Sequence, residues 1–358
     1  MRLERLVARG VRNLHDLDRA FPAEGVALLG RNGQGKTNLL EAVYYPVLFR
    51  SFRGAVDGEV ARFGGVGFQI ESRFADAGGS HEVTVTYHAG NRRKRLALDG
   101  AEVERLTDVA GAWLAVAFLP SDTALASGPA TERRQYLDRM LSLADRHYLK
   151  ALARYRAALA QRNSALRQGR FELAQAFDGV LATAGSAIVR ARLAWMEPGA
   201  RQFAEEFDGL GEPLAAALRY VGRPELAEAA EWPAALAAAE GRDRARGMTT
   251  VGPHRDDVAL EVGGRTLRDF GSTGQQRSAA IALKLIELAT LRSARGEEPA
   301  LLLDDVFAEL DRERQRRLAE RLFGGGRQVL ISAPRRDELP ENLTLPVWSV
   351  EGGVVGDG

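Results

Sequence analysis

The chain has 358 residues, of which 45% are hydrophobic and 27% charged, and its formal net charge is only +1. These ordinary globular values disfavour disorder and a fibrous repeat, and they restrict any nucleic-acid surface to a local patch. No cysteine is present, which excludes disulfides, thiolate catalysis and cysteine-based zinc sites, and no apolar run approaches the roughly 20 residues that span a bilayer.

The first third of the chain is predicted to contain strands and one helix. Strand-like segments between residues 3 and 29 end in an apolar run before a glycine, and a helix is expected over 36–48. Three alternating segments separated by glycine-rich turns predict an antiparallel meander at 68–71, 81–88 and 94–98. The apolar run at 113–119 is long enough for a buried strand, which Pro120 ends.

The middle of the chain is predicted to be a second, mainly helical lobe. Residues 131–240 are rich in alanine, leucine and arginine with helical periodicity, and breaks are expected at Gly169, Pro198 and Pro213. Heptads are not sustained over this region, so no long coiled coil is expected. A short β pair follows, at 258–262 and 266–267.

The last part of the chain returns to alternating helices and strands. A helix is expected to begin near Gln275, and it is followed by a strand at 300–303, a helix at 312–322 and a strand at 328–332. Strands at both ends with helices between them predict an α/β P-loop fold whose sheet is split in sequence by the helical lobe. We expect the ATPase lobe to comprise 1–120 and 295–358, and the helical lobe to comprise 121–294.

The most specific motif lies at 30–37, where Gly-Arg-Asn-Gly-Gln-Gly-Lys-Thr matches the phosphate-binding pattern G-x-x-x-x-G-K-[ST] between a predicted strand and a predicted helix. Glycines let the backbone bring its N–H groups to phosphate oxygens, where the new helix presents the positive end of its dipole. Lys36 is expected to reach the β- and γ-phosphates of ATP and to act in catalysis, and Thr37 is expected to bind Mg²⁺. The predicted ATP-binding residues here are Gly30, Arg31, Asn32, Gly33, Gln34, Gly35, Lys36, Thr37 and Asn38.

Two carboxylates, Asp304 and Asp305, follow the apolar run at 300–303. In P-loop ATPases a strand-end aspartate holds Mg²⁺, and the next acid is placed to polarise the attacking water. We therefore expect Asp304 to bind the metal together with Thr37, and Asp305 to be catalytic. The alternative is a helix N-cap with a solvated neighbour.

A third motif, Ser272-Thr273-Gly274-Gln275, opens a predicted helix. Its hydroxyl and backbone N–H groups could bind an anion, so Ser272, Gly274 and Gln275 are predicted to contact ATP. Taken alone, the segment is better explained as an ordinary capped helix start. Its place in the chain, one helix before the strand that ends in the two carboxylates, favours the functional interpretation.

The three motifs, in this order, resemble those of the ABC-type ATPase heads, with a Walker A motif at 30–37, a signature at 272–276, a Walker B motif at 301–305 and a D-loop at 308–311. Among these heads the chain is most similar to the RecF family of bacterial DNA replication and repair proteins. The segments that carry this similarity are 30–44, 51–53, 132–134, 137–138, 252–257, 272–277 and the two aspartates. The resemblance implies an ABC-type P-loop ATPase head with a mixed sheet and no coiled-coil arms.

The resemblance also implies a mode of action. Two molecules are expected to close head to tail as an ATP-dependent homodimer, each holding ATP between its own Walker A motif and the partner's signature. Members of the family bind double-stranded and gapped DNA when ATP closes the dimer, and they act with RecR and RecO to place the recombinase RecA at single-strand gaps and junctions. The resemblance thus implies a weak Mg-dependent ATPase of recombinational DNA repair.

Two positions depart from the ABC pattern. The residue after the Walker B aspartate is generally glutamate, whereas here Asp305 is one methylene shorter. The switch histidine is absent, and Ser332-Ala333-Pro334 stands in its place. The shorter side chain should hold the attacking water less well, so slow ATP hydrolysis is predicted. Slow hydrolysis suits a protein that stays closed on its target for a set time better than a motor or a pump.

Two arginine-rich regions are candidates for DNA contact. Residues 91–95 bring four cations into a predicted hairpin, although a solvated turn explains them equally well. The helical lobe adds arginines interleaved with Tyr148 and Tyr155, and most of them are expected to face water or pair with acids. These are Arg133, Arg134, Arg139, Arg146, Arg154, Arg156, Arg162 and Arg167.

Other functions compete with this interpretation. The nucleotide-binding subunit of a membrane transporter shares the three motifs but is disfavoured by the missing histidine and by the RecF-like segments. A GTPase or kinase is disfavoured because the chain has no guanine-reading Asn-Lys-x-Asp motif and because Ser-Thr-Gly-Gln would then have no function. A clamp that binds ATP without hydrolysing it would need only Asp304. The N-terminus lacks the apolar core of a signal peptide, so we expect a cytoplasmic protein without membrane contact.

Overall fold

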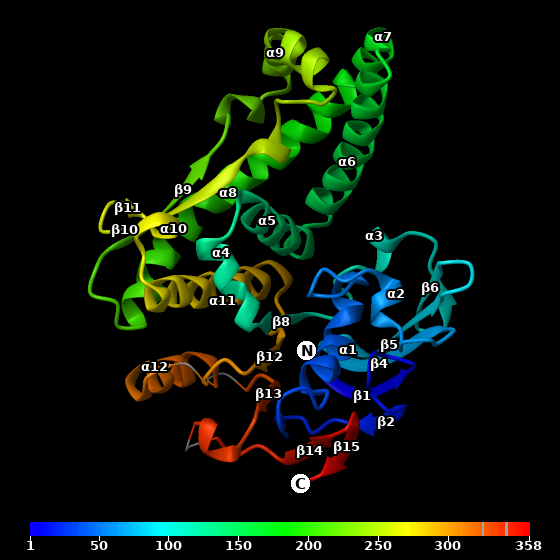
Figure 1. Cartoon of the computed structure of the whole chain (residues 1–358), viewed down its shortest axis with the longest axis vertical. Coiled ribbons are helices and arrows are strands. Elements are labelled where there is room, and N and C mark those ends of the chain that lie inside the picture. The colour runs from blue at the N-terminus through cyan, green and yellow to red at the C-terminus, as the bar shows by residue number, and fades with distance from the viewer. Residues whose placement is uncertain (309, 324–325, 341–342) are drawn as a thin grey trace. The chain divides into compact units, whose positions relative to one another are not determined.

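The computed structural model describes residues 1–308, 310–323, 326–340 and 343–358. The chain folds into two compact units, and the first unit is interrupted in sequence by the second (Figure 1). Unit 1 contains Met1–Asp122 and Glu287–Gly358, and unit 2 contains Thr123–Ile286. The second boundary falls inside helix α11 (Thr273–Arg295), a few residues before the position expected from the sequence.

One sheet of unit 1 is a six-stranded mixed sheet with the order β15-β14-β3-β13-β12-β8. Its strands are β3 (Gly25–Leu29), β8 (Ala115–Phe118), β12 (Ala300–Asp304), β13 (Val329–Ala333), β14 (Val347–Glu351) and β15 (Val354–Asp357). All of them except β15 run parallel to their neighbours. Their carboxyl ends therefore meet at one edge, which is where α/β sheets bind ligands.

The other sheet of unit 1 is antiparallel and has the order β2-β1-β4-β5-β6-β7. Its strands are β1 (Arg2–Arg9), β2 (Leu17–Ala20), β4 (Gly67–Asp76), β5 (Gly79–His88), β6 (Arg93–Leu98) and β7 (Ala101–Glu102). Ile70 pairs with Val85, and Val85 pairs with Leu96. The predicted meander is confirmed by this register.

Helix α1 (Lys36–Leu48) has the predicted bounds and is buried on nearly all sides. It contacts β4 and β5 of the antiparallel sheet and β8, β12 and β13 of the mixed sheet. This position explains why α1 lacks the one-sided apolar stripe of a surface helix. The other helices of unit 1 are α2 (Asp57–Val60), α3 (Leu106–Val109) and α12 (Arg312–Leu322), the last again as predicted.

Unit 2 is mainly helical. Its helices are α4 (Ala124–Ser127), α5 (Ala130–Ala144), α6 (Arg146–Arg167), α7 (Phe171–Gln175), α8 (Asp178–Gly209), α9 (Trp232–Arg246), α10 (Leu267–Phe270) and the first part of α11. Its sheet has the order β11-β10-β9, formed by β9 (Ala216–Val221), β10 (Asp257–Val262) and β11 (Arg265–Thr266). In the described residues, short 3-10 helices lie at Pro120–Thr123, Pro224–Ala227, Ala229–Glu231, Pro253–Arg255 and Arg336–Glu338.

Two expectations for unit 2 were wrong. Pro198 does not break a helix but lies inside α8, where the buried Trp195 and Phe203 on either side anchor both halves of the helix. The region expected to be helical also contains β9, which pairs along its whole length with β10. Packing and strand pairing with distant residues therefore override the local signals there.

Buried ion pairs join the two segments of unit 2 that carried the RecF resemblance, 132–138 and 252–257. The Arg192 guanidinium is 2% exposed and contacts Asp138 at 2.7 Å and Asp256 at 3.3 Å. Arg133 forms a second pair with Asp257, at 2.7 Å. Removing one partner of such a pair leaves a buried charge uncompensated, which typically destabilises a fold by about 3–5 kcal/mol. These segments therefore have a structural role in unit 2.

Candidate functional site

The loop at residues 30–35 leaves the buried strand β3 and enters α1 at the carboxyl edge of the mixed sheet. Gly33 and Gly35 have φ of 81° and 116°, in the region where glycine is favoured. A Cβ atom on Gly33 would have no atom within 4 Å. The loop therefore turns tightly and leaves open space at Gly33, as a loop that receives a phosphate requires.

Lys36 lies inside this loop. Its side chain is 4% exposed, and its ammonium donates to the carbonyl oxygens of Gly30 at 2.5 Å and Arg31 at 3.4 Å. Among the described residues, loop carbonyls are the hydrogen-bond partners of this buried ammonium, which can exchange them for phosphate oxygens. The residues present thus fit the triphosphate expected at this position.

Thr37 and Asp304 meet although 267 residues separate them, because β12 ends beside the start of α1. The Thr37 hydroxyl donates to Asp304 Oδ1 at 3.0 Å, and Asp304 is 4% exposed. In the described residues no cluster of three or more His, Asp or Glu side chains could hold a metal. A hydroxyl and a carboxylate still fit Mg²⁺, which usually takes one or two carboxylates and completes its shell with phosphates and water.

Asp305 lies next to this pair in a left-handed backbone conformation, with φ of 49°. Burial, followed by the charge of Asp304, raises the pKa of the Asp305 carboxyl, and the Lys36 ammonium opposes the shift. The helix N-cap alternative for these aspartates is wrong, since the cap of α12 is Asp311, whose side chain accepts from the Arg314 N–H at 2.9 Å.

Ser332 is part of this site, and the sequence did not predict it. It pairs with Asp304 across β12 and β13. Its hydroxyl donates to Asp304 Oδ1 at 2.7 Å and lies 3.2 Å from Asp305 Oδ1, while it accepts from the Asp305 N–H at 3.1 Å. The only signal in the sequence was that a serine stands where ABC heads have histidine. A buried hydroxyl therefore holds both aspartates in place.

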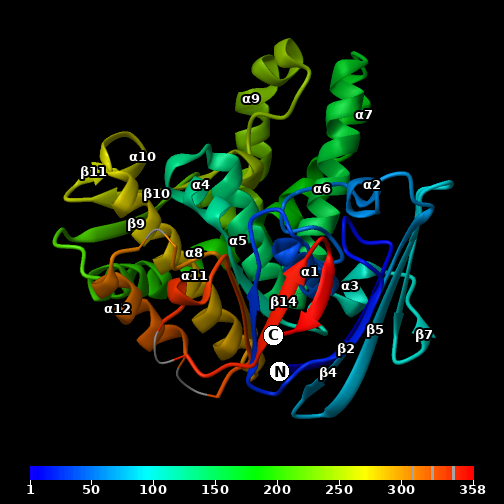
Figure 2. The same cartoon turned by 60° about the horizontal axis from the view of Figure 1, so that its bottom comes forward.

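The hairpin β14–β15 is hydrogen-bonded to the glycine loop, and this contact was also not predicted from the sequence. The N–H groups of Gly352 and Gly353 donate to the Gln34 side-chain oxygen at 2.7 Å and to its carbonyl at 2.8 Å. Figure 2 shows this red hairpin among the blue N-terminal segments, consistent with the pairing of β14 with β3. The first turn of α1, which follows the loop, is held by a second contact: the Asn38 side chain donates to Asn13 Oδ1 at 2.6 Å.

A charged cluster lies one turn further along α1. Glu41 is fully buried and accepts from Arg12 at 2.9 and 3.0 Å, and the Ser51 hydroxyl also donates to it. Arg53 donates to Asn38 Oδ1 at 3.0 Å. Residues 51–53, one of the segments that resemble the RecF family, are therefore hydrogen-bonded to α1 next to the glycine loop.

The signature residues lie in unit 2, where Ser272 is exposed. The Gln275 N–H donates to the Ser272 hydroxyl at 3.2 Å, and the Ser272 N–H donates to Gln275 Oε1 at 3.0 Å. This reciprocal pair is a capping box at the start of α11. Gly274 lies in the first helical turn. Glu309, in the predicted D-loop, lies outside the described residues.

The chain is similar to known proteins over most of its length. A family model described as "AAA domain, putative AbiEii toxin, Type IV TA system" matches residues 26–332. The DNA replication and repair protein RecF of Anaeromyxobacter sp. strain Fw109-5 is 37% identical over 99% of both chains. The chain belongs to the RecF family. RecF of Myxococcus xanthus strain DK1622 is 36% identical over 93% of this chain and 90% of its own.

Solved structures agree with this assignment to the RecF family. "Structure of the recombination mediator protein RecF-ATP in RecFOR pathway" matches with a TM-score of 0.91 and 27% identity, covering 100% of this chain and 97% of that one. An SMC head bound to the C-winged helix domain of ScpA matches with a TM-score of 0.58 and 15% identity, covering 99% and 96%. The fold is therefore that of the ABC/SMC-type ATPase heads, as predicted. Over the residues that the structure describes, no helix is both long and apolar enough to cross a membrane.

Proposed function

We propose that this chain is an ATP-dependent DNA-binding protein of recombinational repair, in which ATP and Mg²⁺ drive two copies to close on DNA. The observation that carries the proposal is the meeting of Lys36, Thr37 and Asp304 at one sheet edge, in a chain of the RecF family. Lys36 then binds the β- and γ-phosphates, and Thr37 and Asp304 hold Mg²⁺, which neutralises phosphate charge. The glycine loop orients the triphosphate through its N–H groups.

The second half of the nucleotide site comes from the other copy. The capping box of α11 places the Ser272 hydroxyl and the first N–H groups of the helix at an exposed helix start. Such a start attracts an anion, because its N–H groups and the helix dipole favour negative charge. Ser272, Gly274 and Gln275 of one copy are proposed to contact the ATP held by its partner. RecR and RecO are proposed partners at single-strand gaps, where the chain would assist recombinase loading.

Hydrolysis is expected to be slow. Asp305 polarises the attacking water as a carboxylate, but its side chain is short and its pKa is raised by burial and by Asp304. We expect a turnover number below about 1 s⁻¹, at the low end of typical enzymes. Turnover should rise with pH through the raised pKa of Asp305, since only the deprotonated form is active. Steady-state ATPase assays between acidic and neutral pH check both points. Fast turnover, or a pH profile unchanged in Asp305→Asn, would contradict this role.

Helix α6 supplies the best surface for DNA in unit 2. It carries no acidic residue, and its exposed cations Arg146, Lys150 and Arg154 make no ion pair in the described part of the chain. Two other arginines that were expected to be available for DNA form ion pairs within unit 2. Arg162 pairs with Asp178 and Asp243, and Arg156 pairs with Asp138. Tyr148 and Tyr155 are buried, so they cannot stack on bases.

Salt dependence of DNA binding tests the proposal. With ATP, affinity for duplex DNA should fall steeply between about 50 and 200 mM salt, and binding should require ATP. Replacing Arg146, Lys150 and Arg154 by alanine should reduce the slope of log K against log salt by about 2 to 3, since each phosphate contact contributes about 0.9. A matched control replaces the exposed, ion-paired Arg190, Arg219 and Arg223. Affinity that is flat with salt, or independent of ATP, would refute the proposal.

A further inference from the structure

Phe63 is a fully exposed aromatic side chain, with a relative exposure of 103%. It occupies the second position of a tight turn, because the Gly65 N–H donates to the Arg62 carbonyl at 2.8 Å and Gly64 has φ of 72°. A positive φ at the third position is typical of a type II turn. Val66, three residues after Phe63, is 89% exposed, so two apolar side chains are exposed close together in the chain. Neighbouring exposed apolar groups of this kind mark interaction sites.

The turn is held on both sides, so the exposure of Phe63 does not result from a loose chain. On its N-terminal side Ala61 bridges to Val11, and the Arg62 N–H donates to the Gly10 carbonyl at 2.7 Å. The Arg62 guanidinium also pairs with Asp16 at 2.8 Å. On its C-terminal side the Ala89 N–H donates to the Val66 carbonyl at 2.9 Å. The structure therefore presents the ring at a fixed place.

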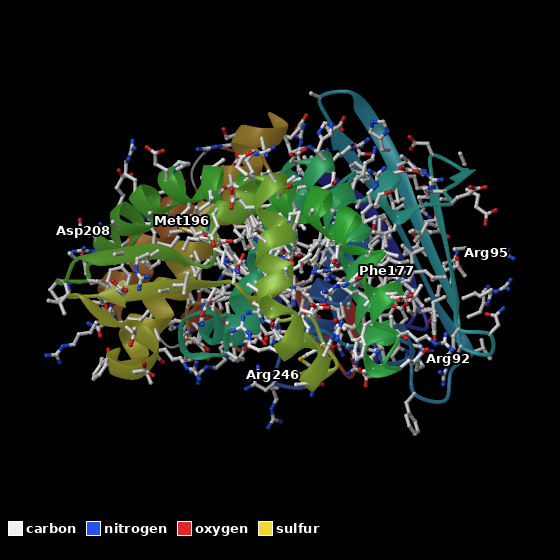
Figure 3. All side chains as sticks on the ribbon, turned by 90° about the horizontal axis from the view of Figure 1, so that it is seen from above. Arg92, Arg95, Phe177, Met196, Asp208 and Arg246 are labelled. Carbon is white, nitrogen blue, oxygen red and sulfur yellow. The ribbon has the colours of Figure 1, made fainter. Side chains whose placement is uncertain are left out.

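Free arginines lie next to this turn. Ala89 begins the loop between β5 and β6, which carries Arg92 and continues into Arg93 and Arg95 at the start of β6. All three arginines are exposed and make no ion pair with any described residue. Figure 3 shows Arg92 and Arg95 projecting outward from this hairpin.

Two acids and the lysine of this region are paired. Asp16 pairs with Arg62, and Asp57 pairs with Lys94 at 2.9 Å. Lys94 also donates to the Phe49 carbonyl at 2.6 Å, so it is not part of the exposed cluster that the sequence suggested. Glu59, four residues before Phe63, is exposed, and its carboxylate accepts from the Val56 N–H at 3.2 Å. The three arginines outnumber this acid, so the charge of the surface is positive.

A shallow depression of about 340 Å³ borders the turn. Its lining includes Gly65 and Val66 before β4, Thr86 and His88 on β5, and the ion pair of Arg62 with Asp16. The depression therefore combines the exposed apolar side chain of Val66 with polar groups. A nucleobase, which has polar edges and apolar faces, fits such a surface.

We propose that Phe63 stacks on an unpaired DNA base while Arg92, Arg93 and Arg95 hold the phosphates on either side, so that this face binds the single strand at a gap or junction. The inference rests on the proposed DNA binding and specifies which DNA structure is preferred. A base within a duplex has both faces covered by its neighbours, whereas an unpaired base offers a face to an aromatic ring. The arginines neutralise backbone charge without reading sequence.

The charge of the surface argues against a protein partner on this face. The buried core of a protein interface is depleted of charged residues, whereas three free arginines lie next to the Phe63 turn. A stacking side chain beside cations is instead the usual arrangement for single-stranded nucleic acid. A second copy of the chain is retained as an outcome of the test.

The test compares two DNA ligands with the full chain, ATP and Mg²⁺: a blunt duplex, and the same duplex with a single-stranded tail. By fluorescence anisotropy, Phe63→Ala should weaken binding to tailed DNA by about 5- to 100-fold, as expected for losing one stacked base, and should change duplex binding by less than about twofold. Phe63→Trp should preserve tail binding. Phe270→Ala is the matched control, since Phe270 is 67% exposed on α10 of unit 2.

Photocrosslinking provides a direct readout. With 5-iodouracil at the first unpaired positions of the tail, the crosslinked peptide should contain Phe63, and the yield should fall in Arg92→Ala. Equal weakening of both DNAs by Phe63→Ala would overturn the inference. So would a Phe63→Ala variant that binds tailed DNA normally but no longer dimerises, which would assign this face to a second copy. Wild-type protein that binds no DNA in ATP would instead refute the proposed function itself.

Discussion

Lys36→Ala is expected to weaken ATP binding by at least about 100-fold, because it removes two charge-assisted hydrogen bonds of about 1.5–3 kcal/mol each from the phosphates. The ammonium of Lys36 is buried inside the glycine loop, where its hydrogen-bond partners in the described part of the chain are the carbonyls of Gly30 and Arg31. The other cation of the loop, Arg31, is exposed rather than buried and is not expected to replace it. Isothermal titration with ATP and Mg²⁺ measures the loss, and every ATP-dependent step should disappear with it.

Two further variants make this result specific. Lys36→Arg should also fail, because a planar guanidinium does not fit a site shaped for a compact ammonium. Lys150→Ala removes an exposed lysine from α6 and should bind ATP like the wild type. If Lys36→Ala bound ATP within about tenfold of wild type, the energetic role assigned to Lys36 would be wrong.

Ser272→Arg is expected to abolish ATP-dependent dimerisation while each monomer still binds ATP. Ser272 is exposed at the start of α11, and in the closed dimer only a small hydroxyl would fit beside the partner's phosphates. Arginine adds bulk there, removes the cap and places a cation at the positive end of the helix dipole. Sizing chromatography with and without ATP measures the effect.

Ser272→Ala separates the loss of the cap from the added bulk. It removes the hydroxyl that accepts from Gln275 but introduces no obstruction, so it should destabilise the helix start by about 0.5–2 kcal/mol and weaken dimerisation without abolishing it. ATP titration of both variants should match the wild type, since the Walker A loop is untouched. A Ser272→Arg protein that dimerises normally in ATP would exclude the composite site.

Local patterns in the sequence were sufficient for the elements around the Walker A loop. Helices α1 and α12 have the predicted bounds, and β12 and β13 are shifted from the predicted ranges by one residue at most. These elements are marked by glycines, apolar runs and caps that act within a few residues. The positions of the catalytic candidates on strand ends and a helix start follow directly from them.

The residues that were missed gain their roles from distant partners. Ser332 contacts both aspartates only because β13 pairs with β12 in one particular register. Asn13 and Gly352 contact the glycine loop from segments with no recognisable motif. Lys94 was grouped with the exposed cations because of its neighbours in sequence, whereas the fold brings Asp57 to it. Sequence periodicity shows which face of an element is buried, but it does not show which residue lies opposite.

The bracing of Gln34 by Gly352 and Gly353 has a consequence for biosynthesis. The Walker A loop is translated before β12 and β13, which complete the sheet below it, and before the hairpin β14–β15 that holds Gln34. A nascent chain therefore lacks a completed nucleotide site until these later segments have been translated and have folded. The order of the residues thus disfavours capture of ATP by a partly synthesised chain.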